Sequence, residues 1–374
     1  MSISVEKKLG FGAMRLPLTD SEDPRSIDLA QFQQMADLFM ERGFRYFDTA
    51  YPYHDGYSEE AVRQCVVERY PRDSFLLADK MPILQVKEPG DYERFFAEQL
   101  RRCGVDYFDV YLLHNLGRDR WPNTERFGGF DFLRRLKERG LARNIGFSFH
   151  DDAETLDRIL AEHPEVDVVQ LQINYLDWDG AVAQSGRCYG VAARHGKDVI
   201  VMEPVKGGQL AKLPDAAKAL FTDFYGDAEP SPASLAIRFA ASQENVKVVL
   251  SGMSTPEQVE DNTAYMREFA PLSAGERDLA ERIARELKRA IRVPCTSCRY
   301  CMEVCPQNIA IPDYFGLLNL HAVTGKKTNM YYERYSMNHG KASECLKCGL
   351  CEKNCPQHIA IREMLEEFAA LYEA

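Results

Sequence analysis

The chain has 374 residues, of which 45% are hydrophobic and 28% are charged, and its formal net charge is −11. This composition is ordinary for a globular protein and excludes extensive disorder or a fibrous repeat. The negative charge argues against a surface that binds nucleic acid or an anionic membrane. No apolar run approaches the length of a membrane span, about 18 residues, and the N-terminal sequence lacks the apolar segment of a signal peptide. We therefore expect a cytoplasmic protein.

Eight short apolar segments alternate with amphipathic stretches over the first 270 residues. The apolar segments are residues 9–17, 44–50, 75–82, 107–115, 143–150, 166–176, 198–204 and 246–253. Helical patterns lie between them, for example at 28–42, 58–70, 91–103, 152–162 and 180–195. Uninterrupted apolar strands are typical of a parallel sheet that is covered on both faces. The alternation indicates an α/β fold, a (β/α)8 TIM barrel. A doubly wound open sheet is the alternative, but no G-x-G-x-x-G motif follows an early strand.

The sequence predicts two helix N-termini at the end of this region. Thr255 and Gln258 flank Pro256 in a capping-box pattern, and Ser273 and Glu276 repeat the spacing. The second start opens a helix with one apolar stripe, formed by Leu279, Ile283, Leu287 and Ile291. We expect this helix to carry the chain from the barrel to a C-terminal segment of different composition.

The cysteines are concentrated at the C-terminus. Three of the 11 (Cys65, Cys103 and Cys188) lie in expected barrel helices, where a free cysteine is a small buried hydrophobe. The other eight lie in the last 80 residues. Disulfides would need an oxidising compartment, so reduced thiolates that bind metal are the better interpretation. The expected organisation is a barrel over 1–272, a connecting helix over 273–293 and a metal-binding domain over 294–374.

The eight C-terminal cysteines form two copies of the pattern C-x2-C-x2-C-x3-C-P. The first copy comprises Cys295, Cys298, Cys301 and Cys305, and the second comprises Cys345, Cys348, Cys351 and Cys355. This is the pattern of two-cluster ferredoxins, in which the fourth cysteine ligates the other cluster. We therefore expect two [4Fe–4S] clusters, one held by Cys295, Cys298, Cys301 and Cys355, the other by Cys345, Cys348, Cys351 and Cys305. Two zinc sites are the alternative, although zinc ribbons favour separated C-x2-C pairs.

The two cysteine patterns are separated by 39 residues, more than a short hairpin needs. Helical patterns occur in this stretch at 311–323 and 329–337. The segment thus resembles the α-helical ferredoxin domains of dicluster respiratory subunits more than the small βαβ type. We expect a small α-helical, ferredoxin-like domain.

Polar residues follow three successive strands of the expected barrel, where active sites of this fold lie. They are Asp48 after the second strand, Lys80 after the third and His114 after the fourth, with Tyr53 in the loop beyond Asp48. The pKa of a tyrosine is near 10, and a neighbouring ammonium lowers it. A carboxylate can pair with the lysine, and a histidine can orient a carbonyl group. Each residue alone is weak evidence, but their conjunction predicts a proton-donating site.

The motifs DTAYPY (48–53), ADK (78–80) and YLLHN (111–115) resemble those of the aldo/keto reductase family, in order and in spacing. RNIGFS (143–148), VVQLQINYL (168–176), EPVKGG (203–208) and SGMSTPEQVEDN (251–262) continue the resemblance. The whole chain resembles the subgroup with a C-terminal ferredoxin domain. The resemblance implies that Tyr53 is the general acid, supported by Asp48, Lys80 and His114.

The same resemblance implies a nicotinamide nucleotide and the residues that hold it. Ser148 and Gln170 would hold the carboxamide, Gly207 and Gly208 would approach the pyrophosphate, and Asp261 and Asn262 would approach the adenine. Four further positions of the expected nucleotide site are Met202, Pro204, Gly252 and Gln258.

Three positions depart from the family pattern. Met202 stands where an aromatic residue usually stacks on the nicotinamide, and a methionine packs less rigidly. Gly252 and Gln258 stand where basic residues often hold the 2′-phosphate of NADPH. Phe149 and then His150 follow Ser148, where an asparagine is frequent. NADH or NADPH is therefore expected as the cofactor, with NADH used at least as well as NADPH.

Residues that could contact the substrate lie in loops at the expected mouth. These candidates are Tyr51, His54, Trp121, His150 and Trp178, each of which could instead have a structural role. The substrate is expected to be a small carbonyl compound or the corresponding alcohol.

Three functions are compatible with these motifs. The first is an NAD(P)H-dependent oxidoreductase that interconverts a carbonyl and an alcohol. The second is an electron-transfer reductase whose clusters exchange electrons with a ferredoxin or flavoprotein partner. Nicotinamides move hydride whereas clusters move single electrons, and flavin is the usual converter between them. The third is a non-catalytic barrel that binds a partner, against which the four active-site residues argue.

Overall fold

A computed structural model describes residues 3–20, 23–118, 120–180, 184–226, 230–289, 292–293, 295, 300–355 and 359–373. The chain forms two compact units. The first comprises Met1–Lys212 and Ala228–Ala280, and the second comprises Leu213–Asp227 and Glu281–Ala374. Each is considered in turn below.

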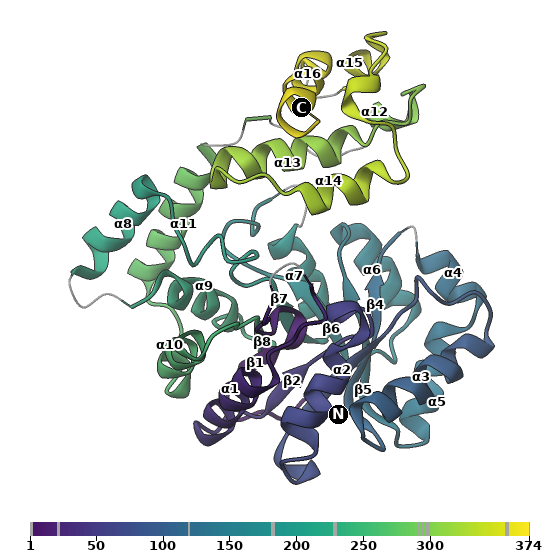
Figure 1. Ribbon diagram of the computed structural model, residues 1–374, viewed down its shortest axis with the longest axis vertical. Helices are drawn as coiled ribbons and strands as arrows, with labels where there is room; N and C mark the ends of the chain where they lie inside the picture. The colour runs from purple at the N-terminus through teal and green to yellow at the C-terminus, as the bar shows by residue number, and fades with distance from the viewer. Residues whose placement is uncertain are drawn as a thin grey trace. The chain divides into compact units, whose positions relative to one another are not determined.

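The first unit is a closed barrel of eight parallel strands in sequence order, in which the last strand pairs with the first (Figure 1). The strands are β1 (Leu9–Gly12), β2 (Tyr46–Asp48), β3 (Leu76–Met81), β4 (Phe108–Leu116), β5 (Ala142–Phe149), β6 (Val168–Gln172), β7 (Asp198–Met202) and β8 (Val246–Ser251). Each coincides with one of the eight predicted apolar segments, with β4 and β5 extending one residue beyond theirs. The TIM-barrel prediction is therefore confirmed.

Helices cover the outside of the barrel. In the first unit they are α1 (Leu29–Glu41), α2 (Ser58–Val62), α3 (Gly90–Cys103), α4 (Trp121–Arg126), α5 (Gly129–Glu138), α6 (Ala153–Glu162), α7 (Ser185–Arg194), α9 (Pro232–Ala241) and α10 (Pro256–Arg267). Side-chain caps fix several of their starts. Asp28, Asp152, Ser231 and Thr255 each accept a hydrogen bond from the backbone N–H three residues on.

Two apolar layers hold the barrel together. The outer layer, between strands and helices, includes an aromatic group in which Phe11 packs against Phe32, Phe39 and Phe47. The inner layer fills the barrel and includes Tyr46, which is 1% exposed. Since successive side chains on a strand point to opposite faces, each strand supplies both layers. Polar residues at the carboxyl ends of the strands are thereby left at the mouth.

Helix α11 (Ala274–Arg289) begins as the sequence predicts. Ser273 Oγ accepts from the Glu276 N–H, and Glu276 accepts from the Ser273 N–H at 2.8 Å. These reciprocal bonds form a capping box. Leu279, Ile283 and Leu287 are buried, and Ile291 lies outside the described residues.

The second unit is helical. It contains α8 (Asp215–Tyr225), the C-terminal part of α11, α12 (Tyr300–Glu303), α13 (Ile311–Thr324), α14 (Asn329–Ser336), α15 (Leu350–Lys353) and α16 (Ile361–Tyr372). The helices predicted at 311–323 and 329–337 are confirmed as α13 and α14. Stacked rings form much of its core: Phe368 lies 4.6 Å from Tyr314 and 4.5 Å from Tyr372, centroid to centroid. No helix in the described ranges is both long and apolar enough to cross a membrane.

Candidate active site and cysteine sites

The four residues of the predicted proton-donating site meet at the mouth of the barrel. Lys80 Nζ lies 2.5 Å from Asp48 Oδ1 and 3.4 Å from the Tyr53 hydroxyl oxygen. It also donates to the Thr49 carbonyl oxygen at 2.8 Å. The rings of Tyr53 and His114 meet edge to face, with their centroids 5.9 Å apart. The structure thus brings together a carboxylate, an ammonium, a phenol and an imidazole from successive strand ends.

Lys80 is the electrostatic centre of this group, and its side chain is 1% exposed. Burial acts to lower the pKa of Lys80, but Asp48 and Tyr53 outweigh burial and the pKa is raised. Lys80 is therefore an ammonium at neutral pH. The second oxygen of Asp48 accepts from Gln170 Nε2 at 3.2 Å. The carboxylate is held at both oxygens and keeps Lys80 beside Tyr53.

The acidity of Tyr53 differs from the sequence-based expectation. Desolvation raises the pKa of Tyr53, and the Lys80 ammonium acts in the opposite direction with a smaller effect. The sequence argument identified the effect of Lys80 but had no measure of burial. Tyr53 is therefore fully protonated at neutral pH, which suits a proton donor rather than a proton acceptor.

His114 is neutral. Burial lowers its pKa well below the ordinary value, and Lys80, His150 and Arg120 act in the same direction. A neutral imidazole can give or accept a hydrogen bond but lacks the acidic proton of imidazolium. His114 is thus suited to hydrogen bonding, and Tyr53 is suited to donating a proton.

Ser148 and Gln170 lie next to each other on β5 and β6, where they are register partners. Both are buried, and Ser148 Oγ accepts from the Asn115 N–H at 2.7 Å. The two residues predicted to hold a carboxamide thus form one polar pair beside the Asp48 carboxylate.

The loop after β7 has an unusual backbone. Glu203, Lys206, Gly207 and Gly208 all have positive φ angles, which strain residues other than glycine. The Gly207 N–H donates to Glu203 Oε2 at 2.5 Å. Of the other predicted residues here, Pro204 is buried and Met202, the last residue of β7, is partly exposed.

Sequence reasoning missed one cation at this loop, Arg15. Its guanidinium lies 3.7 Å from Glu203 Oε1, and its aliphatic stem covers Gly252. Arg15 is the last residue of a short 3-10 helix, Ala13–Arg15, that follows β1, and the only signal in the sequence was a basic residue after the first strand. A guanidinium and the Gly207 N–H therefore converge on one carboxylate, which makes this place suitable for an anion.

The remaining predicted nucleotide residues lie along α10 and have partners within the barrel. Gln258 accepts from the Ser254 N–H at 2.7 Å, and Asp261 accepts from Ser231 Oγ at 2.6 Å. Asn262 is buried: Nδ2 donates to Ser251 Oγ, and Oδ1 accepts from the Tyr265 hydroxyl, each at 2.7 Å.

The aromatic substrate candidates make structural contacts. Trp121 is 8% exposed and donates to Glu125 at 2.7 Å. Trp178 packs edge-on against Phe239 at 5.4 Å. Their packing favours the structural alternative for both tryptophans.

Two other mouth candidates also have partners. Tyr51 packs edge-on against Phe95 at 5.2 Å. His54 Nε2 accepts from the Leu16 N–H at 3.2 Å, and Nδ1 lies 2.7 Å from the Pro24 carbonyl oxygen. His150, the residue directly after β5, has an exposed side chain.

Four cysteines line one cavity of the second unit: Cys305, Cys345, Cys348 and Cys351. They are the four that the sequence assigns to one cluster. Apolar side chains, among them Ile309, Ile311 and Leu365, share the rest of the lining with Gln307 and Arg362. Within the described ranges, no group of three or more His, Cys, Asp or Glu side chains could hold a metal ion. The four thiols line a cavity rather than converge on one point. This arrangement fits an iron–sulfur cluster, which is larger than a single metal ion.

The other predicted cluster site is described in part. Cys301 and Cys355 are buried in the core of the second unit, and Cys295 packs against the same core. Cys298 lies outside the described residues. Cys65, Cys103 and Cys188 are buried in the barrel unit and form no disulfide, as predicted.

Comparison with known proteins agrees with this geometry. The sequence model of the aldo/keto reductase family matches residues 8–284, and that of the 4Fe-4S dicluster domain matches residues 294–360. An aldo-keto reductase of Mycolicibacterium vanbaalenii is 29% identical over 239 residues, which are 62% of this chain and 77% of that protein. The NADH-specific methylglyoxal reductase of Escherichia coli is 25% identical over 293 residues, and the match covers 66% of this chain and 85% of that protein.

Solved structures share the barrel. An aldo-keto reductase from Klebsiella pneumoniae, in complex with NADPH, superposes with a TM-score of 0.57 at 22% identity, covering 75% of this chain and 96% of that one. The fold and the site define an oxidoreductase. The chain belongs to the aldo/keto reductase family, and it carries a C-terminal 4Fe-4S dicluster domain.

Proposed function

We propose that the protein is an NAD(P)H-dependent reductase of small carbonyl compounds, with Tyr53 as the general acid. The observation that carries the proposal is the buried Asp48–Lys80 pair with Lys80 Nζ 3.4 Å from the Tyr53 hydroxyl. The reverse reaction, oxidation of an alcohol, uses the same groups.

The mechanism follows from the protonation states. A reduced nicotinamide nucleotide, when bound near Ser148 and Gln170, would supply the hydride, and the residues of the chain act on the carbonyl oxygen. The neutral His114 donates a hydrogen bond that orients the carbonyl oxygen, and the Tyr53 hydroxyl gives its proton to that oxygen. The Lys80 ammonium stabilises the phenolate that is left, and Asp48 holds Lys80 in place. Because an alkoxide is a far stronger base than a phenolate, a raised Tyr53 pKa does not prevent this transfer.

The chain's residues fit a nicotinamide nucleotide. Ser148 and Gln170 offer a hydroxyl and an amide for the carboxamide. Glu203 bridges the Arg15 guanidinium and the Gly207 N–H, and a pyrophosphate would take the place of that carboxylate. We assign Arg15 to the pyrophosphate because its guanidinium reaches the Gly207 loop.

We further propose that NADH is used at least as well as NADPH. Gly252 and Gln258 carry no charge at the positions where a 2′-phosphate is often held. The Lys206 ammonium pairs with both oxygens of Asp177, at 2.8 and 2.7 Å, so its charge is already balanced by a carboxylate. The name of the Escherichia coli relative, an NADH-specific reductase, supports the same preference.

The nucleotide proposal predicts a pattern of dissociation constants measured by calorimetry in one buffer. The Kd for NADH should equal or lie below that for NADPH. Arg15→Ala should weaken both by a similar factor, about tenfold, the scale of one charged hydrogen bond. Arg134→Ala, which removes an exposed ion pair on α5, is the control and should change neither. A tenfold preference for NADPH in the wild-type protein would show that a cation other than those considered holds the 2′-phosphate. A loss in Arg15→Ala confined to NADPH would place that site at Arg15.

For the second unit we propose two [4Fe–4S] clusters with exchanged fourth ligands. One is held by Cys345, Cys348, Cys351 and Cys305, and the other by Cys295, Cys298, Cys301 and Cys355. The cavity lined by the first set supports this arrangement. We also propose that the barrel spans 1–272, that a helix over 273–293 connects it, and that 294–374 form the cluster domain.

The second candidate function is electron transfer between the clusters and a ferredoxin or flavoprotein partner. It is favoured by Cys348, an exposed cysteine on the cluster cavity, because an accessible ligand is a place where electrons can leave.

Anaerobic titration with NADH distinguishes the two functions. Nicotinamide absorbance and the electron paramagnetic resonance of the clusters are recorded together, with and without a panel of small aldehydes and ketones. If the barrel reduces carbonyl compounds without the clusters, NADH should be oxidised only when a carbonyl compound is present, and the paramagnetic resonance signal of the clusters should not change. Clusters reduced by NADH alone would establish electron transfer instead.

A further inference from the structure

Two carboxyl groups lie buried behind the active site. Asp79 directly precedes Lys80 on β3, so its side chain points to the outer face of the barrel wall. There it meets Glu59 of α2, and both residues are 0% exposed. The two carboxyl groups are hydrogen-bonded to each other. Such a bond requires a proton on one of them, because two carboxylates only accept.

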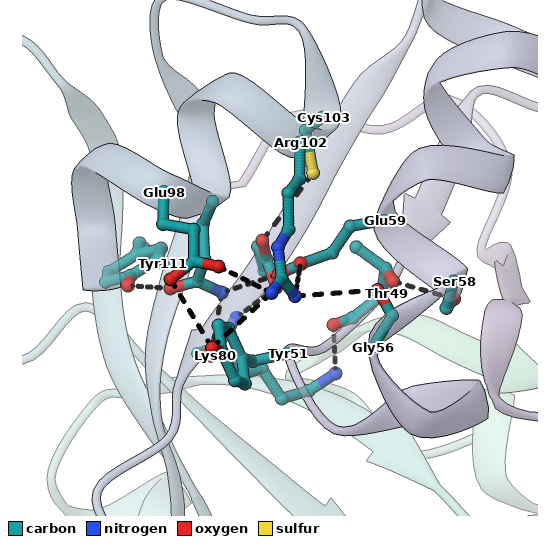
Figure 2. A network of polar contacts seen from close by, with 12 residues as sticks. Thr49, Tyr51, Gly56, Ser58, Glu59, Lys80, Glu98, Arg102, Cys103 and Tyr111 are labelled. Atoms are coloured by element: carbon teal, nitrogen blue, oxygen red, sulfur yellow. Dashed lines mark hydrogen bonds and ion pairs between the residues drawn. The ribbon is translucent and has the colours of Figure 1, made fainter. Parts of the chain in front are cut away.

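The surrounding donors show which group carries the proton (Figure 2). Gln99 Nε2 donates to the Lys80 carbonyl oxygen at 3.0 Å and to Glu59 Oε1 at 3.1 Å. Because the Lys80 carbonyl oxygen can only accept, the NH2 group of the Gln99 side chain must face it, and the orientation of that amide is fixed. Arg102 donates to Glu59 Oε2 at 3.1 Å. Glu59 therefore accepts at both oxygens, and one of its donors is a guanidinium. Asp79 accepts from the Lys80 N–H and from the Cys103 thiol, which is a weak donor. Glu59 is therefore the better stabilised carboxylate, and we take Asp79 as the group that carries the proton.

The charges around the pair balance with one proton present. Asp79 Oδ1 accepts from the Lys80 N–H at 2.7 Å, and the Cys103 thiol lies 3.7 Å from Oδ2. Burial, together with the nearby Glu59, raises the pKa of Asp79 well above its ordinary value. The titratable or charged side chains that interact with the pair include Lys80, Arg102, Cys103, Tyr51, Tyr53 and Tyr111. The singly protonated pair carries one negative charge, which faces the Arg102 guanidinium, while Asp48 pairs with Lys80.

The pair joins the two segments that carry the catalytic groups. Gln99 connects Glu59 to the Lys80 backbone, and Glu59 opens the helix that follows the Tyr53 loop. The base of that loop is closed by a bond of 2.9 Å between Thr49 Oγ1 and Ser58 Oγ. A shift of α2 would therefore change the distance between Lys80 and Tyr53.

We propose that Asp79 and Glu59 share one proton, held on Asp79, and that this carboxyl pair is a positioning element that sets Lys80 against Tyr53. The inference rests on the proposed function only in treating Lys80 and Tyr53 as catalytic. A neutral Asp79 also leaves the full charge of Lys80 to act on Tyr53, because an ionised Asp79 would oppose it.

Infrared difference spectroscopy tests where the proton is, without reference to activity. The wild-type protein at neutral pH should show the carbonyl stretching band of a protonated carboxylic acid that is absent in Asp79→Asn. Glu98→Gln, which alters the outer partner of Arg102, is the control and should keep the band. If Asp79→Asn leaves the spectrum unchanged, the shared proton is disproved even if Tyr53 is the acid.

Kinetics test the positioning role. Asp79→Asn keeps a neutral donor to Glu59, so kcat should stay within about threefold of wild type. Asp79→Ala should lower kcat about tenfold to a hundredfold, the scale of a small misplacement of catalytic groups, with the nucleotide Kd unchanged. Glu59→Gln should be more damaging than Asp79→Asn. The glutamine amide has a single oxygen, so it can accept from Gln99 or from Arg102 at that oxygen, but its NH2 group cannot accept from the other. Equal damage in Asp79→Asn and Asp79→Ala, or equal tolerance of Glu59→Gln and Asp79→Asn, would overturn the proposal.

Discussion

Replacement of Tyr53 by phenylalanine should lower kcat for carbonyl reduction by about 10²–10⁴-fold, the usual contribution of a general acid. The ring remains, so its edge-to-face contact with His114 and the nucleotide Kd should persist. Tyr57, in the same loop and 48% exposed, provides the matched control, and Tyr57→Phe should keep the wild-type rate. Activity of Tyr53→Phe within threefold of wild type would remove Tyr53 from the mechanism.

The same residue governs the expected pH profile. A proton donor is active when the pH lies below its pKa. The ordinary pKa of a tyrosine is about 10, and burial raises the pKa of Tyr53 above that value. Reductive kcat/KM should therefore be constant through neutral pH and fall only in strongly alkaline buffer. Oxidation of the alcohol needs the phenolate and should increase with pH over the same range. A reductive rate that falls near neutrality would assign the profile to another group.

The second large effect concerns Cys305. Protein prepared and reconstituted without oxygen should contain about eight iron and eight sulfide per chain, that is, two clusters of four. Cys305→Ala should remove a ligand of the cluster held by Cys345, Cys348 and Cys351, rather than of the cluster nearest in sequence. The iron content should fall to about four per chain.

Two measurements make the ligand exchange falsifiable. In Cys305→Ala, a further change of Cys348 to alanine should remove no more iron, because both residues serve one cluster. Cys65→Ala, at a buried barrel thiol, should leave the iron content unchanged. About two zinc ions per chain, without visible charge-transfer absorbance, would replace the cluster assignment by zinc sites.

The sequence predicted those features that depend on local pattern. The strands follow from runs such as 107–115, and the capping of α11 follows from the spacing of Ser273 and Glu276. Asp48, Lys80 and His114 could be brought together because the carboxyl ends of parallel strands share one end of a barrel.

Features that depend on tertiary packing could not be read in this way. The raised pKa of Tyr53 comes from burial, which a sequence does not quantify. Asp79 appears in the ADK motif, but its contact with Glu59 needs the placement of α2 against β3. Arg15 and Glu203 are far apart in sequence, and they meet only because the barrel closes β8 onto β1.

The division of the chain has a consequence for its synthesis. Leu213–Asp227 belongs to the second unit, yet it is made before residues 228–280, which complete the barrel. Helix α8 therefore emerges from the ribosome before any cysteine of the C-terminal pattern and must wait for the last part of the chain. The packing of the second unit can therefore be completed only after the last part of the chain has been made.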